Sequence, residues 1–73
     1  MDQIKELVEK NGKGSGTLVG VDGHAFSLIA YTERKLYKAG WTKGDISTVR
    51  KVAMSGNYNA LICTLDACLE EEE

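Results

Sequence analysis

The sequence predicts a small α+β domain that is mostly helical. Proline is absent from the 73 residues, apolar residues recur at helical spacing in four stretches, and glycine-containing turns separate these stretches. The predicted order is a short N-terminal helix, one short strand or extended segment, and three helices that pack together. A chain of this length forms one domain, which we divide into a lead-in helix and glycine-rich connector (1–16), a compact core (17–69) and an acidic tail (70–73).

Two interpretations fit the N-terminal region. Ile4, Leu7 and Val8 have the i, i+3, i+4 spacing of a helix over residues 2–10. The alternative is a β-hairpin in which residues 4–8 pair with residues 17–21. We favour the helix because Glu, Lys and Leu are strong helix formers. Three glycines in residues 11–16 predict a flexible connector. The β-branched residues of 17–21 predict a short strand, for which a second copy is the other available partner.

The longest predicted helix begins at Asp22 and ends at Ala39-Gly40. The Asp22 carboxylate is a suitable N-cap, and Gly40 suits the left-handed position after the last turn. We expect the later helices to pack on this one. The side chains predicted to face the core are Ala25, Phe26, Leu28, Ile29, Leu36 and Ala39, with Thr32 among them.

A shorter helix is predicted over residues 43–54. Thr42 is its expected N-cap, with Asp45 three residues later as the reciprocal partner of a capping box. Trp41 comes just before the cap and is expected to pack on Ile46, as in a hydrophobic staple. Residues 55–56, Ser-Gly, end the helix.

The last predicted helix is capped by Asn57 or Asn59. Its tail, Glu70–Glu73, places carboxylates at the negative end of the helix, so we expect the tail to fray into solvent. The apolar stripe of this helix has the spacing of a core-facing side. It contains Tyr58, Leu61, Ile62, Leu65, Cys68 and Leu69.

Charge is distributed unevenly along the chain. The net charge is −2, but residues 24–51 hold six basic and two acidic side chains, whereas residues 52–73 hold five acidic side chains and no basic one. The basic residues, with one tyrosine, follow helical spacing along one predicted face of the longest helix. The candidate binding surface is Tyr31, Arg34, Lys35, Lys38, Lys43, Arg50 and Lys51.

A basic surface suits either an acidic protein or the phosphates of a nucleic acid. The isoelectric point of about 5.3 is low for a nucleic-acid-binding domain, and the last predicted helix carries no Lys or Arg. We therefore predict a protein partner, or self-association into a homodimer, with nucleic-acid binding through the basic face as the alternative.

No stretch predicts catalysis, a metal site or a cofactor. The run N-G-K-G-S-G-T at 11–17 lacks the glycine spacing of phosphate-binding and dinucleotide-binding loops. His24 is the only histidine, and Cys63 and Cys68 lack the close spacing of zinc ligands. On one helix these cysteines lie too far apart for a disulfide. With no apolar run of about 18 residues, we expect no membrane partner and a cytoplasmic location.

Three short motifs resemble those of a group of small bacterial and phage proteins of unknown function. The group typically reads Asp-Gly-Asn-Ala-Phe, then a Gly-Trp-Thr-like helix start, then Ser-Gly-Asp-Tyr. The corresponding segments here are 22–26, 40–42 and 55–58, and the chain departs from the group at His24 and Asn57. The resemblance implies a compact, mostly helical fold and a phage or mobile-element setting, and it implies no activity.

One further binding prediction concerns the start of the longest helix. A small anionic ligand would bind near residues 22–26, where Asp22, Gly23 and His24 precede the first turn. We give this prediction less weight than the basic surface, because a capping role explains the same residues.

Overall fold

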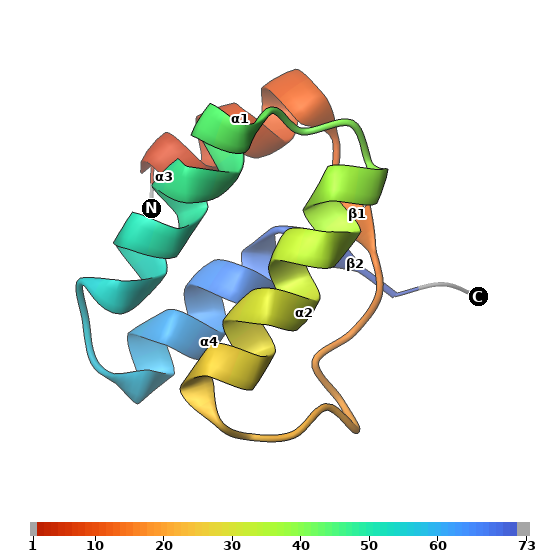
Figure 1. The fold of residues 1–73 in the computed structure, drawn as a ribbon. Helices are drawn as coiled ribbons and strands as arrows, with labels where there is room; N and C mark the ends of the chain where they lie inside the picture. The colour runs from red at the N-terminus through yellow and green to blue at the C-terminus, as the bar shows by residue number, and fades with distance from the viewer. Residues whose placement is uncertain (1, 72–73) are drawn as a thin grey trace.

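The computed structural model describes residues 2–71, which form four helices and a two-stranded parallel sheet (Figure 1). The mostly helical α+β class is confirmed, and the last three helices form the expected three-helix unit. Residues 72–73 of the predicted acidic tail lie outside the described part of the chain. The elements in order are α1 (Asp2–Asn11), β1 (Gly14–Ser15), α2 (Ala25–Lys38), α3 (Lys43–Met54), α4 (Tyr58–Ala67) and β2 (Leu69–Glu70).

The N-terminal segment is a helix, so the hairpin alternative is wrong. Ile4 of α1 is buried in the core, and α1 contacts α3 and α4. Asp45 at the start of α3 accepts hydrogen bonds from Asn11 Nδ2 at 3.0 Å and from Lys10 Nζ at 3.2 Å. These two hydrogen bonds hold the pKa of Asp45 below its usual value, and the bond from Asn11 has the larger effect. The carboxylate of Asp45 therefore docks α1 on α3.

The strand lies in the glycine-rich connector, not at residues 17–21 where it was predicted. Gly14 and Ser15 pair in parallel with Leu69 and Glu70, respectively. The predictions of a flexible connector and of fraying at Glu70 are therefore both wrong. Glycine is needed at position 14 because an added Cβ would lie 3.2 Å from the carbonyl carbon of Lys35 in α2. This close approach outweighs the entropic cost of glycine in a strand.

Helix α2 begins two residues later than predicted, because His24 and not Asp22 is its N-cap. His24 Nδ1 accepts a hydrogen bond from the backbone N–H of Phe26 at 3.3 Å. Asp22 Oδ1 accepts from the backbone N–H of His24 at 3.1 Å, which fixes the turn before the helix. At the other end Gly40 has a φ of +95°, so its predicted left-handed role is confirmed.

The predicted caps of α3 and α4 are confirmed. Thr42 Oγ1 accepts from the backbone N–H of Asp45 at 3.1 Å, and Asn57 Oδ1 accepts from the backbone N–H of Ala60 at 2.9 Å. The Asp45 carboxylate also bonds to α1, so the same residue takes part in the cap of α3 and in the docking of α1. The start of each helix is thus set by a side chain that the sequence identifies.

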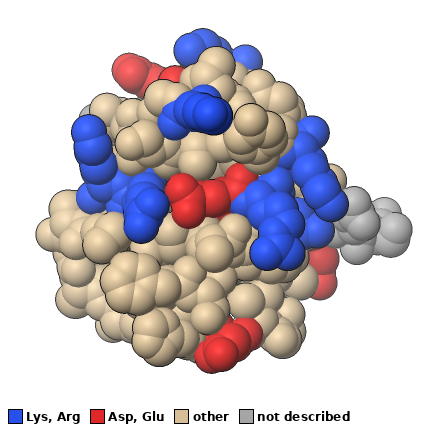
Figure 2. All heavy atoms as spheres, viewed as in Figure 1, with Lys and Arg blue, Asp and Glu red and all other residues tan. Residues whose placement is uncertain are grey.

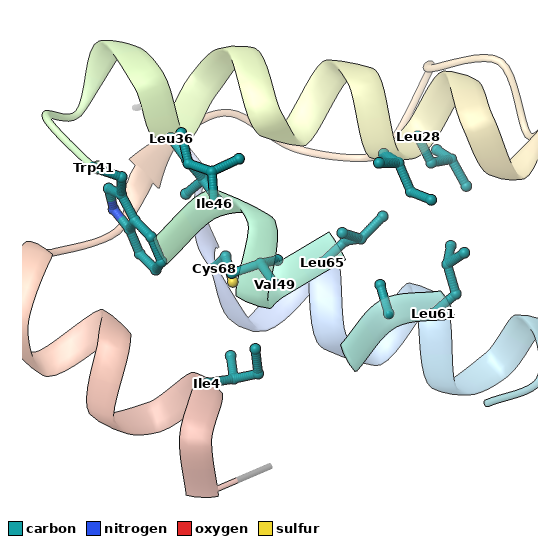
Figure 3. Packing of buried hydrophobic residues seen from close by; sticks show 11 residues of the cluster. Ile4, Leu28, Leu36, Trp41, Ile46, Val49, Leu61, Leu65 and Cys68 are labelled. Carbon is teal, nitrogen blue, oxygen red and sulfur yellow. The ribbon is translucent and has the colours of Figure 1, made fainter. Parts of the chain in front are cut away.

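The core runs through the three-helix unit and extends to α1. Figure 3 shows its side chains continuing from Leu28 and Leu61 at one end to Trp41 and Ile4 at the other. Three residues predicted to face the core are instead exposed, namely Phe26, Ala39 and Tyr58. They lie in the first turn or at the C-cap of a helix, where no further described element covers them.

Candidate binding groove

A groove of about 610 Å³ opens between α2 and α3. The two helices are joined by the short turn at residues 39–42 and run side by side (Figure 1). Ile46, which is only 6% exposed, and Tyr37, which is 60% exposed, give the groove apolar surface. A partner's apolar side chains could therefore be buried here without displacing the core.

Four basic side chains line this groove from both helices. Arg34 and Lys38 come from α2, and Lys43 and Arg50 come from α3. Within residues 2–71 the one ion pair, between Lys10 and Asp45, involves none of them. Figure 2 shows Lys and Arg side chains gathered around a small acidic spot on the face that α2 and α3 present. The groove therefore combines an apolar floor with basic groups that lack an ion-pair partner.

The predicted face of the longest helix is divided between two directions. Arg34 and Lys38 line the groove toward α3, whereas Tyr31 turns toward the connector and accepts a hydrogen bond from the backbone N–H of Thr17 at 3.2 Å. Lys35 follows Tyr31, with its Nζ 5.4 Å from the centre of the tyrosine ring. Arg34 and Lys35 line different hollows because neighbouring helical residues point about 100° apart.

Lys35 instead lines a second hollow of about 460 Å³, together with Lys38, Lys13 and Ser15. Strand β1 brings Lys13 and Ser15 to the last turn of α2, since Gly14 packs against the backbone of Lys35. Lys13 was not among the predicted binding residues. Lys38 lines both the groove and this hollow, so the basic surface continues from one to the other. Lys51 is exposed and is not among the residues that line either.

Four residues of the groove were missed by the sequence analysis, namely Glu33, Tyr37, Ile46 and Ser47. The first two lie one turn apart on α2, beside Arg34 and Lys38, and the others lie one turn before Arg50 on α3. A prediction that α2 and α3 are neighbours joined by a short turn would have placed these residues opposite one another. The missing signal was the pairing of the helices, which periodicity within one helix does not contain.

The residues of the predicted small-anion site hold the turn before α2. Asp22 and His24 use their side chains in the capping bonds described above, and the carbonyl oxygen of Gly23 accepts a hydrogen bond from the Tyr58 hydroxyl at 2.6 Å. Residues 17–33 contain no Lys or Arg. The carboxylate of Asp22 would also repel an anion. An anion site here stays a prediction, with less support than the basic groove has.

The two cysteines are free, and they differ in environment. Cys63 is exposed, whereas Cys68 is buried and its thiol donates to the carbonyl oxygen of Thr64 at 3.4 Å. Burial raises the pKa of Cys68 to about 11, although the nearby charge of Lys13 opposes the shift. At neutral pH Cys68 is therefore a protonated core side chain and not a nucleophile.

Residues 2–71 bring together no group of three or more His, Cys, Asp or Glu side chains placed to hold a metal ion. Among the helices of the same part of the chain, none has both the length and the apolar character needed to cross a bilayer.

Comparisons of the chain with protein-family models, with curated proteins and with solved structures find no significant match.

Proposed function

We propose that this chain is a small non-catalytic binding protein that holds an acidic segment of a protein partner in the groove between α2 and α3. The supporting observation is the convergence of Arg34 and Lys38 with Lys43 and Arg50 around Tyr37 and Ile46. Carboxylates of the partner would pair with the basic groups, and its apolar side chains would cover the floor. The protein then acts as an accessory or regulatory factor by occupying its partner.

The composition of the groove favours a protein over a bare polyanion. Tyr and Arg are enriched at protein interfaces, and Ile46 provides an apolar floor that phosphates cannot use. The low isoelectric point, about 5.3, points the same way. The motif resemblance supports a phage or mobile-element setting, and we propose the cytoplasm as the place of action.

The test uses a fluorescent peptide of about 15 residues, long enough for about four helical turns, with Glu and Leu on opposite faces. Binding is measured by fluorescence anisotropy. We expect Arg34→Glu and Lys38→Glu each to weaken binding about tenfold or more, because each replaces an attractive charge with a repulsive one. Lys51→Glu is the matched control, since it makes the same charge change outside the groove and should change affinity about twofold or less.

Two results would contradict the proposal. One is equal weakening by Lys51→Glu and the groove variants, which would mean that only net charge matters. The other is unchanged binding of a peptide with Gln in place of every Glu, which would mean that the basic side chains do not contribute.

Nucleic-acid binding is the second candidate, and one observation favours it. Lys38 belongs to both hollows, so Lys13 and Lys35 extend the basic surface beyond the groove. If a phosphate backbone follows this surface, affinity should fall steeply as the salt concentration rises, and Lys35→Glu should weaken binding. If neither duplex nor single-stranded DNA binds at low salt, this candidate fails.

A further inference from the structure

The second hollow, beside the last turn of α2, differs from the basic groove in its lining. Its volume of about 460 Å³ lies within the range of about 300 to 1,000 Å³ that is usual for small-ligand sites. Its lining residues include three lysines, and none of them is acidic. We call it the lysine hollow, and it is lined by Lys13, Ser15, Lys35, Lys38 and Ala39.

Two segments of the chain bring the lysines to this hollow. Lys35 and Lys38 are three residues apart and therefore share one face of α2. Lys13 and Ser15 flank Gly14 and both line the hollow, as expected from the alternation of side chains along an extended strand. Gly14 packs against the backbone of Lys35, where its missing Cβ permits the close approach. The connector therefore brings an ammonium group and a hydroxyl group to the last turn of α2.

The side chain of Lys35 is held in place by its neighbours. Lys35 is half-buried, and its Nζ lies 5.4 Å from the centre of the Tyr31 ring. A Cβ at Gly16 would lie 3.4 Å from the Cε atom of Lys35, so the connector also passes close to the stem of this lysine. An ammonium group that is already positioned loses less conformational entropy when an anion binds.

None of the three ammonium groups has an ion-pair or hydrogen-bond partner in the described part of the chain. The one ion pair of residues 2–71 joins Lys10 to Asp45. Lysines near the end of a helix often bond to its last carbonyl groups. Here the backbone N–H of Ala39 already donates to the carbonyl oxygens of Lys35 and Leu36. The hollow therefore gathers three positive charges without a negative one, which a bound anion would supply.

The lining of the hollow indicates a small phosphate-like anion. Ammonium groups are point-charge donors that bind phosphate, and the hydroxyl of Ser15 is a further donor. Ala39 is the one apolar residue of the lining, so the apolar side chains of a peptide would bury little surface here. None of the lining residues is aromatic, so a nucleic-acid base would find no ring on which to stack.

We propose that the lysine hollow binds a phosphate dianion, either free inorganic phosphate or the terminal phosphate of a small phosphate monoester. Lys13 and Lys35 pair with its oxygens from the connector and from α2, and the Ser15 hydroxyl donates a hydrogen bond to it. A dianion is favoured over a monoanion because several positive charges share the hollow. Lys38 is the one residue that also lines the basic groove. The proposal rests on Lys13 and Lys35, so it does not depend on the function proposed for the groove.

The test is a titration of the ¹⁵N-labelled protein, followed by two-dimensional NMR at constant ionic strength. The probes are inorganic phosphate, methyl phosphate and dimethyl phosphate. Methyl phosphate is a dianion at about pH 7.5, because the second pKa of a phosphate monoester is about 6, whereas dimethyl phosphate carries one charge. We expect saturable shifts at the amides of Lys13, Ser15 and Ala39 with the first two probes, and at least about tenfold weaker binding of dimethyl phosphate. The tighter of the first two probes identifies the source of the phosphate.

Lys13→Gln and Lys35→Gln should each weaken phosphate binding about tenfold or more, because each removes a charged hydrogen-bond donor. Lys51→Gln is the matched control, since Lys51 is exposed and lines neither hollow. It should change the affinity about twofold or less. Circular dichroism checks that every variant remains folded.

Three results would overturn the proposal. The first is the absence of saturable shifts at Lys13, Ser15 and Ala39 at millimolar phosphate. The second is equally tight binding of dimethyl phosphate, which would mean that the hollow does not select a dianion. The third is equal weakening by Lys51→Gln and Lys35→Gln, which would mean that only net charge matters. Each leaves the binding of the Glu-Leu peptide in the groove unaffected, so the two proposals can fail separately.

Discussion

The indole Nε1 of Trp41 donates a 2.9 Å hydrogen bond to the carbonyl oxygen of Gly12. Trp41 lies in the turn between α2 and α3, and Gly12 follows α1, so this bond joins the N-terminal region to the pair of helices that forms the basic groove. The indole is also buried in the core, with 3% of its surface exposed. One side chain therefore ties the end of α1, just before β1, to the turn that joins the two helices of the groove.

Trp41→Phe should lower the free energy of unfolding by about 1 to 3 kcal/mol, since it leaves the Gly12 carbonyl without its donor and reduces packing. Urea unfolding followed by circular dichroism measures the change, because the variant lacks the tryptophan needed for fluorescence. Tyr37→Phe is the control, as its side chain is exposed. An unchanged unfolding midpoint in Trp41→Phe would show that the bond does not contribute to stability.

Thr32 is fully buried in α2, and its hydroxyl has no hydrogen-bond partner in residues 2–71. Thr32→Val keeps the shape and removes the unsatisfied hydroxyl, so it should raise the free energy of unfolding by about 1 kcal/mol. Thr32→Ser keeps the hydroxyl and removes a methyl group, and should lower it by about 1 kcal/mol. A Thr32→Val protein that melts below the parent would contradict this account.

Gly16 and Tyr31 should be coupled in stability. A Cβ at Gly16 would lie 2.5 Å from the Tyr31 hydroxyl oxygen, and Gly16 has a φ of +156°. Gly16→Ala is therefore expected to be destabilising, and less so when Tyr31→Phe has removed the hydroxyl. Urea unfolding of both single variants and the double variant should give an interaction energy of at least about 0.5 kcal/mol. Additive effects would mean that the clash is relieved elsewhere.

Cys63 and Cys68 should differ in reactivity toward an aromatic disulfide reagent. In the folded protein Cys63 should react at once and Cys68 only as the chain unfolds, because Cys63 is exposed and Cys68 is buried. Two thiols reacting at the same rate in the folded protein would contradict this placement.

The raised pKa of Cys68 should make the stability of the protein depend on pH in the alkaline range. The pKa of Cys68 is about 11 when folded and 9.0 for the free thiol. Between these values the unfolded chain releases the proton first, so the free energy of unfolding should fall as pH rises above about 9. In Cys68→Ala this part of the decrease should be missing. An identical pH profile in the parent and the variant would show that the pKa is not raised.

The parts of the fold that the sequence predicted are those set by local hydrogen bonds. The roles of Thr42, Asn57 and Gly40 involve only the backbone within a few residues of each. These roles could therefore be identified from position and residue type alone. The start of α2 was misplaced because Asp22 and His24 are both suitable caps, and only the backbone of the turn decides between them.

The parts that were missed depend on contacts between distant segments. The strand at Gly14 forms because Leu69 and the last turn of α2 lie beside it, and neither contact leaves a periodic signal. Phe26 has core-facing spacing but ends in solvent, because nothing in residues 2–71 covers the first turn of α2 on that side. Arg34 and Lys38 were predicted as binding residues, whereas Tyr37 appeared only when α3 was placed opposite α2.

The most direct test of the proposed groove is a titration of the ¹⁵N-labelled protein with the Glu-Leu peptide, followed by two-dimensional NMR. The proposal predicts that the largest chemical-shift changes fall on both walls, at Arg34, Tyr37, Lys38 and Ser47, and that they are lost in Arg34→Glu. Changes confined to the lysine hollow around Lys13, or spread evenly over all basic residues, would contradict binding in the groove between α2 and α3.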